Sequence, residues 1–222
     1  MHYLLVHGIG HGGWCWEKTR LHLEKLGHEV STPDLPLTSL ADDANAVIAI
    51  LDSVEGPSVL VGHSYGGSVI SMAASGRTDV SHLFYVAAIM IGADDDFADL
   101  LQKHPSDLNK HMVFGQDNTI TVADEGARAC FYNCCDPDTA AQAVSRLRPT
   151  SAECLNPQAI QAASAPWESI PSTYILCSKD NAIVAGLQEV MARNAQQTVV
   201  IDTDHSPFYS SQEALNSVLC NV

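Results

Sequence analysis

Six short runs of β-branched and other apolar residues are spread along the chain, and patterns of helical spacing separate most of them. The runs cover residues 2–6, 28–33, 58–62, 82–88, 172–177 and 197–202. Strands that alternate with helices in this way are typical of a parallel sheet with crossover helices. With 222 residues, of which 46% are hydrophobic, the chain is long enough for one compact domain of this kind. We therefore expect an α/β fold with about six mostly parallel strands and flanking helices.

Helices can be placed between these runs from the spacing of apolar residues. Residues 40–51 carry one apolar stripe, with Thr38 or Ser39 as the N-cap and two aspartates in the first turn. Residues 183–191 carry a second stripe. Ser210 is followed three residues later by a glutamate, which predicts a capping box and the start of the last helix.

The region 91–166 interrupts the alternation of strands and helices. It contains helical patches and no convincing central strand. A connection of this length inside a compact domain is rarely a bare loop. We therefore expect a mostly helical lid inserted above the carboxyl end of the sheet, with residues 1–90 and 167–222 forming the core domain.

A serine lies between two glycines in the sequence VGHSYGG, at residues 61–67. The pattern G-x-S-x-G follows the predicted strand 58–62 and precedes a helical segment that starts near Tyr65. A serine in this place is either an ordinary turn residue or a nucleophile on a sharp strand-to-helix turn, the nucleophile elbow. The strand before it and the helix after it favour the second interpretation, so Ser64 is the candidate nucleophile.

A nucleophilic serine needs a base, and an acid that orients the base. In this architecture the acid and the histidine follow the serine in that order, each after a strand. Asp180 follows the run 172–177 and His205 follows the last run, so both lie where the order requires. Asp202 and Asp204 are alternatives for the acid, but they are too close in sequence to His205 to orient its ring easily from the far side.

The glycine-rich loop HGIGHGGW, residues 7–14, follows the first predicted strand. In this architecture an oxyanion site uses one N–H directly after the nucleophile and one from this loop. We predict Tyr65 and Ile9 as the two donors, with Gly10 as the alternative to Ile9. The loop lacks both G-x-G-x-x-G and a G-K-[ST] ending, so a nucleotide phosphate is not expected here.

Several aromatic side chains are candidates for a substrate pocket. His11 and Trp14 belong to the loop after the first strand, and Phe131 and Tyr132 belong to the expected lid. Because ligand pockets are mostly apolar, these side chains are predicted to bind the acyl or aromatic part of a substrate. The two lid aromatics fit equally well into a core of the lid itself.

Four stretches, HGIGHGGWCW, GHSYGG, YILCSKDNAI and HSPF, together resemble motifs of the α/β-hydrolase superfamily. Over nearly its whole length the chain is similar to the branch that holds plant methylesterases of the salicylate-binding type, hydroxynitrile lyases, and bacterial and fungal esterases. This resemblance implies a catalytic triad of Ser64, Asp180 and His205. It also implies Ile9 and Tyr65 as oxyanion donors, and no cofactor.

Two positions depart from the lyases of this branch. In the lyase pattern, threonine follows the loop histidine and lysine follows the catalytic histidine. At these two positions this chain has Gly8 and Ser206. Cyanohydrin cleavage needs a hydroxyl for the substrate alcohol and a cation for the departing cyanide. We therefore expect a serine esterase whose partner is a small-molecule carboxylic ester. A lyase or carbon–carbon bond hydrolase, and a ligand-binding receptor without turnover, are the alternatives.

The charge of the chain argues against two classes of partner. There are 26 acidic and 11 basic residues, which gives a formal charge of -15. This sign is wrong for binding nucleic acid or an anionic membrane surface. No apolar run approaches the roughly 18 residues that span a bilayer, and no signal-peptide pattern stands at the start, so a cytoplasmic protein is expected. The sequence does not fix the assembly, and a homodimer is one that it allows.

Seven cysteines are present, at positions 15, 130, 134, 135, 154, 177 and 220. Three of them, Cys130, Cys134 and Cys135, are close in sequence. No pair has the spacing of a zinc site or of a C-x-x-C redox motif. Free thiols in buried or partly buried places are therefore favoured, and no metal is expected.

Overall fold

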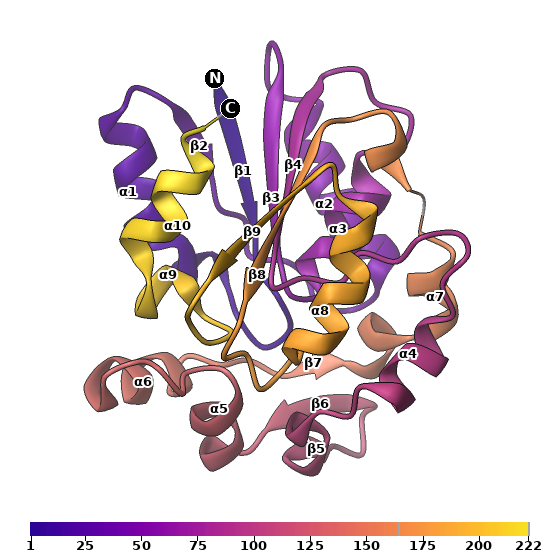
Figure 1. Ribbon diagram of the computed structural model, residues 1–222, viewed down its shortest axis with the longest axis vertical. Helices are drawn as coiled ribbons and strands as arrows, with labels where there is room; N and C mark the ends of the chain where they lie inside the picture. Colours follow the sequence, from indigo (N-terminus) through magenta and orange to yellow (C-terminus); the bar gives the residue numbers. More distant parts are fainter. Residues whose placement is uncertain (164, 222) are drawn as a thin grey trace.

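A six-stranded parallel sheet forms the centre of the protein in the computed structural model (Figure 1). The structure describes residues 1–163 and 165–221, so Ser164 and Val222, which fall in the predicted lid and core ranges, lie outside it. The strand order is β2-β1-β3-β4-β8-β9. The strands are β1 (His2–Val6), β2 (Glu29–Ser31), β3 (Ser58–His63), β4 (Val80–Val86), β8 (Ser172–Cys177) and β9 (Gln197–Ile201). The predicted α/β fold with six parallel strands is confirmed.

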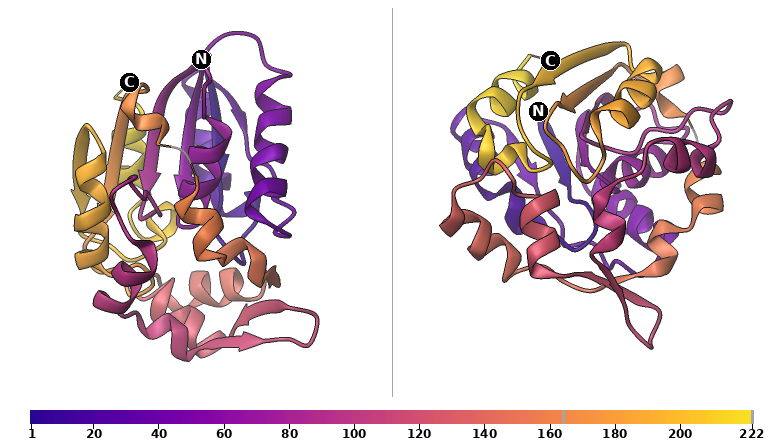
Figure 2. Two further views of the ribbon diagram at one scale, coloured as in Figure 1. Left: turned by 90° about the vertical axis from the view of Figure 1, so that its right-hand side faces the viewer. Right: turned by 60° about the horizontal axis from the view of Figure 1, so that its bottom comes forward.

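Helices cover both faces of this sheet (Figures 1 and 2). They are α1 (Glu17–Lys25), α2 (Leu40–Leu51), α3 (Gly66–Ala73), α8 (Ala185–Met191), α9 (Pro207–Ser210) and α10 (Gln212–Leu219), with short 3-10 helices at Gly13–Trp16 and Ala192–Asn194. On β1, Tyr3 and Leu5 face the core under α1 and α10, while Leu4 and Val6 face the core under α2, α3 and α8. Because both faces are buried, the strands read as continuous apolar runs.

The start of α2 is as predicted, but the start of the last helix is not. Ser39 is the N-cap of α2, and its side chain accepts a hydrogen bond from the Asp42 N–H. Ser210, by contrast, ends the short helix α9, and its hydroxyl donates to Asp204. The predicted capping box at Ser210 is therefore wrong, because this hydroxyl is used by a buried carboxylate instead of the helix.

The lid segment, defined here as residues 91–166, lies across the carboxyl ends of the core strands (Figures 1 and 2). Its helices are α4 (Phe97–Lys103), α5 (Asp124–Cys130), α6 (Pro137–Val144) and α7 (Pro157–Gln161), with 3-10 turns at Asp107–Lys110 and Ala152–Leu155, and a further 3-10 turn, Pro166–Glu168, begins at its end. It also contains an antiparallel sheet of β5 (Met112–Phe114), β6 (Thr119–Val122) and β7 (Thr150–Ser151). The sequence indicated helical patches and no central strand in this region, and it did not indicate this small separate sheet.

Gly67 lies in the first turn of α3, where the helix passes very close to the chain after β4. A Cβ at this position would lie 2.4 Å from the carbonyl oxygen of Ile89. Since backbone on both sides must shift to accept it, we expect Gly67→Ala to lower the free energy of unfolding by about 2 kcal/mol or more. Urea denaturation measures this difference, and an unchanged midpoint would contradict the tight contact.

His7, directly after β1, is fully buried and held in one neutral tautomer. Its Nδ1–H donates to the Gly8 carbonyl at 2.8 Å, and its Nε2 accepts the Leu35 N–H at 2.9 Å. Burial lowers the pKa of His7 to about 4. Protonation at Nε2 would also remove the acceptor of the Leu35 N–H, so the neutral ring is part of the native structure.

Acid should destabilise the fold through His7. The unfolded side chain has a pKa of about 6.5, so the unfolded state binds the proton first as the pH falls. The stabilisation is fully present above pH ~6.5 and is lost as the pH falls toward the folded pKa of about 4. Between pH 7 and pH 5, His7 alone should reduce the free energy of unfolding by about 2 kcal/mol. Urea denaturation at the two pH values should show a smaller fall for His7→Gln, and equal falls would count against this account.

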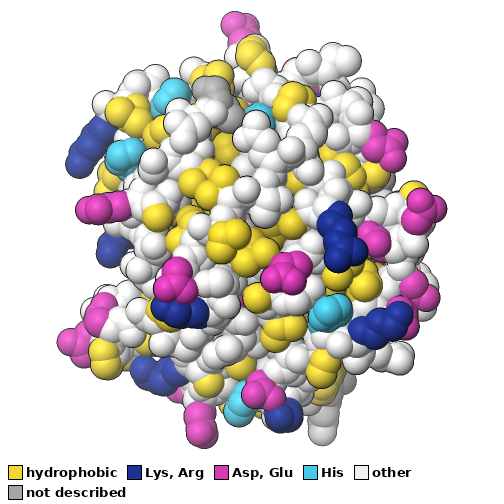
Figure 3. Space-filling model, in the orientation of Figure 1, with side chains coloured by type: hydrophobic (Ala, Val, Ile, Leu, Met, Phe, Trp, Pro, Cys, Tyr) yellow, Lys and Arg dark blue, Asp and Glu magenta, His cyan; other side chains and the backbone are white. Residues whose placement is uncertain are grey.

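None of the described helices is long and apolar enough to cross a bilayer. On the face drawn in Figure 3, acidic and basic side chains are interspersed around apolar areas.

Candidate active site

Ser64 lies at the sharp turn between β3 and α3, at the carboxyl end of the sheet. Its φ is 56°, a left-handed conformation that costs a residue with a side chain about 1–3 kcal/mol. The turn is fixed by backbone hydrogen bonds from the Ser64 N–H to Val86 and from the Ile89 N–H to Ser64. Gly62 makes the turn possible, because a Cβ there would lie 2.6 Å from the Gly66 carbonyl oxygen. This is the geometry of a nucleophile elbow.

Asp180 follows β8 and His205 follows β9, and their side chains meet beyond the carboxyl ends of these strands. His205 Nδ1 lies 2.7 Å from Asp180 Oδ2, and both side chains are buried. The other carboxylate oxygen, Oδ1, accepts the N–H groups of Ala182 at 2.7 Å and Ile183 at 2.9 Å. Burial raises the pKa of Asp180, and His205 together with these N–H groups opposes that rise. The carboxylate is thus fixed on the Nδ1 side of the imidazole.

The two alternative acids have other partners. Asp202 is exposed and forms an ion pair with Lys179 at 2.7 Å. Asp204 is buried and accepts the N–H groups of Cys134 at 2.6 Å and Ser206 at 3.1 Å. In the part of the chain that the structure describes, neither carboxylate bonds to the His205 ring. Only Asp180 among the three has the geometry to orient this histidine.

The His205 ring is packed between two other rings. The ring centroid of His63 lies 4.6 Å away, and Phe131 stacks on His205 at 5.5 Å with an interplanar angle of 29°. His63 Nε2–H donates to the His205 carbonyl at 2.8 Å, and burial lowers the pKa of His63 well below its ordinary value. Within residues 1–163 and 165–221, the Ser64 hydroxyl makes no hydrogen bond to His205; such contacts often shorten only when substrate binds.

Two backbone N–H groups next to Ser64 have no hydrogen-bond acceptor among the described residues, and they belong to Ile9 and Tyr65. The N–H of Gly10 is different, because it donates to Thr150 Oγ1 at 2.9 Å. The N–H of Gly10, the alternative donor in the loop, is therefore already hydrogen-bonded. The two free N–H groups are those that the sequence indicated for an oxyanion.

Gly8 lies directly against the candidate nucleophile. A Cβ at Gly8 would be 2.6 Å from Cβ of Ser64 and 3.1 Å from its Oγ. The position therefore has no room for a larger side chain without movement of the turn. It also presents no hydroxyl to a bound substrate, in contrast to the threonine of the lyase pattern.

A cavity of about 140 Å³ opens beside Ser64, and Ile9 and Tyr65 line it too. On the core side, Ile89 and Leu187 contribute further apolar surface. The lid segment contributes Phe97, Leu101, Leu108 and Met112, together with the more polar His104, Ser106 and Asn109. The candidate nucleophile thus faces a small, mainly apolar space that is closed from above by the lid segment.

The four aromatic residues predicted to bind substrate do not line this cavity. His11 is buried, and its Nε2 is hydrogen-bonded to the Tyr132 hydroxyl at 2.8 Å, while Trp14 stacks on the His11 ring. Phe131 and Tyr132 belong to an apolar cluster that consists mainly of lid residues and also includes Ala182 of the core. Phe131 and Tyr132 are thus surrounded mainly by other lid residues, which was the alternative to a place in the substrate pocket. Their nearest link to the site is the stacking of Phe131 on His205.

Two buried polar side chains support the site and were not predicted. Asp43 on α2 accepts the Tyr65 hydroxyl at 2.7 Å, and burial raises the pKa of Asp43. Gln188 on α8 lies 2.9 Å from Asp180 Oδ2. Each stands next to an apolar stripe position of its helix. In the sequence, a polar residue on the buried side of an amphipathic helix could have indicated these two supporting side chains.

Cysteines near the site contribute mainly backbone groups, such as the Cys134 N–H that donates to Asp204, and Cys154 Sγ lies 3.6 Å from Asp43 Oδ2. All seven are free, and Cys134 is the exposed one. Among the described residues, no group of three or more His, Cys, Asp and Glu side chains is arranged to hold a metal ion.

Known proteins resemble this chain over most of its length. A norfluorocurarine synthase 2 of Strychnos sp is 29% identical, with 100% of this chain and 94% of the relative covered. A methyl jasmonate esterase 1 of Vitis vinifera is 28% identical over 94% of this chain and 91% of its own length. The solved structure of polyneuridine aldehyde esterase superposes with a TM-score of 0.87 at 22% identity, covering 98% of this chain and 97% of that one.

The sequence profile of the Alpha/beta hydrolase family matches residues 3–218. The match includes the elbow serine, the aspartate after β8 and the histidine after β9. Because it spans nearly the whole chain, the protein belongs to the alpha/beta hydrolase family.

Proposed function

We propose that the protein is a serine esterase that cleaves small carboxylic esters through an acyl-enzyme on Ser64. The observation that carries the proposal is the surroundings of Ser64: a strained elbow serine and two unpaired N–H groups open on one cavity. The buried pair of Asp180 and His205 supplies the base and its orienting acid. These are the parts that acyl transfer by serine requires.

In the proposed reaction, His205 Nε2 takes the Ser64 proton as Oγ attacks the ester carbonyl carbon. The N–H groups of Ile9 and Tyr65 hold the oxyanion, and each such donor is typically worth about 10²–10³ in rate. Collapse of the intermediate breaks the bond to the alcohol, which receives the proton from His205. Water then attacks the acyl-enzyme with His205 again as base, which releases the acid and the free serine. Asp180 keeps the imidazole proton on Nδ1 throughout.

The names of the relatives support ester hydrolysis. One curated relative is named a methyl jasmonate esterase and others are named methylesterases. A structural neighbour is a polyneuridine aldehyde esterase. Other relatives carry synthase names, so the reaction has to be tested on this chain itself.

The cavity limits the size of the group that the site accepts. A volume of about 140 Å³ matches a cavity that holds a molecule of roughly benzene size. Its mainly apolar walls, such as Ile89 and Leu187, favour an uncharged acyl or aromatic group. We therefore propose short-chain or small aromatic esters as substrates, and poor turnover of long-chain esters.

The proposal is tested by turnover and covalent labelling together. A series of p-nitrophenyl esters from acetate to octanoate, and a set of aromatic methyl esters, measures the preferred group. A fluorophosphonate probe followed by peptide mass spectrometry should modify Ser64 stoichiometrically. If the folded protein neither hydrolyses any ester nor reacts with the probe at Ser64, the esterase function is wrong.

Trapping of an acyl group on Ser64 and the count of product released per enzyme separate esterase chemistry from the alternatives. A lyase that uses His205 as its base forms no acyl-serine, and a receptor without turnover releases at most one equivalent of product. The absence of a side-chain hydroxyl at Gly8 favours the esterase over the hydroxynitrile lyase.

A further inference from the structure

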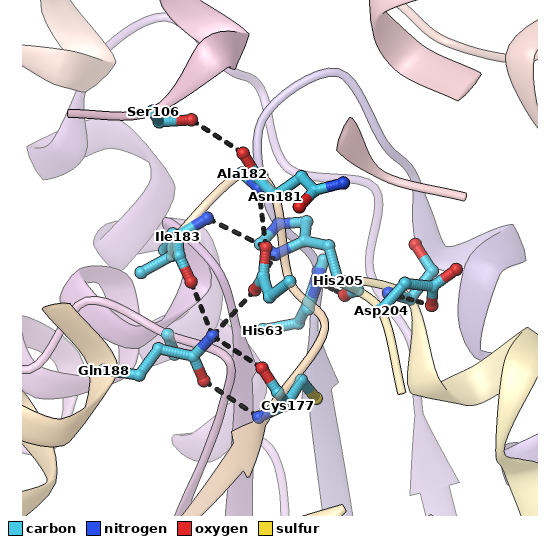
Figure 4. Close-up of polar contacts among 12 residues, drawn as sticks. His63, Ser106, Cys177, Asn181, Ala182, Ile183, Gln188, Asp204 and His205 are labelled. Atoms are coloured by element: carbon cyan, nitrogen blue, oxygen red, sulfur yellow. Dashed lines mark hydrogen bonds and ion pairs between the residues drawn. The ribbon is translucent and has the colours of Figure 1, made fainter. Parts of the chain in front are cut away.

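Gln188 is a fully buried side chain on α8 that turns back toward the carboxyl end of β8 (Figure 4). Its Oε1 accepts the Cys177 N–H at 3.0 Å. Its Nε2 lies 2.9 Å from Asp180 Oδ2, 2.6 Å from the Ile183 carbonyl and 3.3 Å from the Cys177 carbonyl. One amide thus joins the end of β8, the turn after it, and the carboxylate that orients His205.

The orientation of this amide follows from its partners. The Cys177 N–H is only a donor, so it must face the amide oxygen. The other end of the amide faces a carboxylate and two carbonyls, all of them acceptors. A flipped amide would place an oxygen against three acceptors and an NH₂ group against a donor. Gln188 can therefore only donate to Asp180.

With Gln188 in place, the Asp180 carboxylate accepts four hydrogen bonds. Oδ1 receives the N–H groups of Ala182 and Ile183, and Oδ2 receives His205 Nδ1–H and Gln188 Nε2–H. A buried carboxylate needs such donors to stay ionised, since burial favours its neutral form. Without Gln188, the oxygen that faces the imidazole would keep His205 as its one partner.

We propose that Gln188 is a positioning residue for the pair of Asp180 and His205: its amide N–H holds the carboxylate so that Oδ2 faces Nδ1 of the imidazole. The proposal rests on the proposed esterase function, in which His205 accepts the Ser64 proton. The neighbouring Leu187 lines the cavity, whereas Gln188 is not part of its lining and contacts Asp180. Its effect should therefore fall on the rate of the chemical step and not on substrate binding.

The test compares two replacements of Gln188 in the full-length enzyme. Gln188→Met keeps the volume and removes the donor. It should lower kcat about 10- to 100-fold, as loss of a partner that orients a catalytic group commonly does, with KM within about twofold. Loss of the donor makes the carboxylate more basic and favours the imidazolium, so the acid limb of kcat/KM should move to higher pH.

Gln188→Glu keeps an oxygen for the Cys177 N–H and almost the same shape. Its carboxyl can donate to Asp180 only while it is protonated. The ratio of variant to wild-type kcat/KM should therefore fall as the pH rises from 5 to 8. If Gln188→Met does not fold, this variant decides the question: a folded Gln188→Glu whose ratio to wild type stays constant from pH 5 to 8 contradicts the proposal.

Gln197→Glu is the matched control, since Gln197 is exposed at the start of β9, at the opposite end of the sheet. It adds the same charge and should leave kcat and the pH profile unchanged. A second readout does not depend on turnover: the downfield proton resonance of His205 Nδ1–H should shift in both Gln188 variants and not in Gln197→Glu. If the wild type does not hydrolyse esters, the proposed esterase function is wrong, but the His205 resonance still tests the role of Gln188. Unmoved resonances and unmoved acid limbs in the folded Gln188 variants would overturn the proposal.

Discussion

Ser64→Ala is expected to reduce ester hydrolysis to the background rate while the fold stays intact. Removal of the nucleophile leaves only binding and the oxyanion donors, and loss of an elbow serine typically costs about 10⁶-fold in kcat. Alanine meets the same backbone strain as serine at φ 56°, so the unfolding midpoint should change little. The measurement is kcat on the best p-nitrophenyl ester, with urea denaturation of the same samples.

The control for this variant is Ser68→Ala, one turn further along α3. Ser68 is buried, and its hydroxyl has no hydrogen-bond partner among the described residues. Removing that hydroxyl should leave turnover unchanged and stability equal or slightly higher. Turnover by Ser64→Ala at a rate near that of Ser68→Ala would show that Ser64 is not the nucleophile.

Asp180→Asn is expected to lower kcat by about 10⁴-fold with a much smaller change in KM. Both carboxylate oxygens of Asp180 face donors: the N–H groups of Ala182 and Ile183 on one side, and His205 with Gln188 on the other. An amide must turn its NH₂ group toward one of these sides. If it faces His205, the imidazole proton moves to Nε2 and the ring can no longer accept the serine proton.

Two controls separate this effect from a general loss of charge. Asp202→Asn removes an exposed carboxylate whose partners among the described residues are Lys179 and Ser178, and it should leave kcat within about twofold. Asp204→Asn tests the buried alternative, whose hydrogen bonds go to Cys134, Ser206 and Ser210. A larger fall in kcat for Asp204→Asn than for Asp180→Asn, with both variants folded, would reassign the acid.

The features that the sequence predicted well are those that local patterns encode. The core strands and helix α2 follow from apolar spacing and from the cap at Ser39. Ser64, Asp180 and His205 each follow a strand, and parallel strands bring their carboxyl ends to one edge of the sheet. Their mutual placement therefore depends little on details that a sequence does not show.

The features that the sequence did not predict depend on contacts between distant segments. β5 and β7 are very short, so their residues show no periodicity that would indicate strands. β7 also pairs with β6, which lies much earlier in the chain. Phe131 and Tyr132 look the same in a sequence whether they line a pocket or fill a lid core. Gln188 has an ordinary place on a helix, and only the folded chain shows that Asp180 lies within reach.

One stretch of the lid segment, including Phe97, Leu101 and Met112, forms an apolar wall of the cavity beside Ser64, while Asp180 and His205 lie on the core. Part of the surface that would contact the substrate is thus encoded separately from His205, the proposed base, and Asp180, the proposed acid. Drift, insertion or exchange within residues 97–112 can change which ester is accepted without displacing the base or the acid. Diversification of such an enzyme, in nature or by recombination in the laboratory, should therefore concentrate in this stretch.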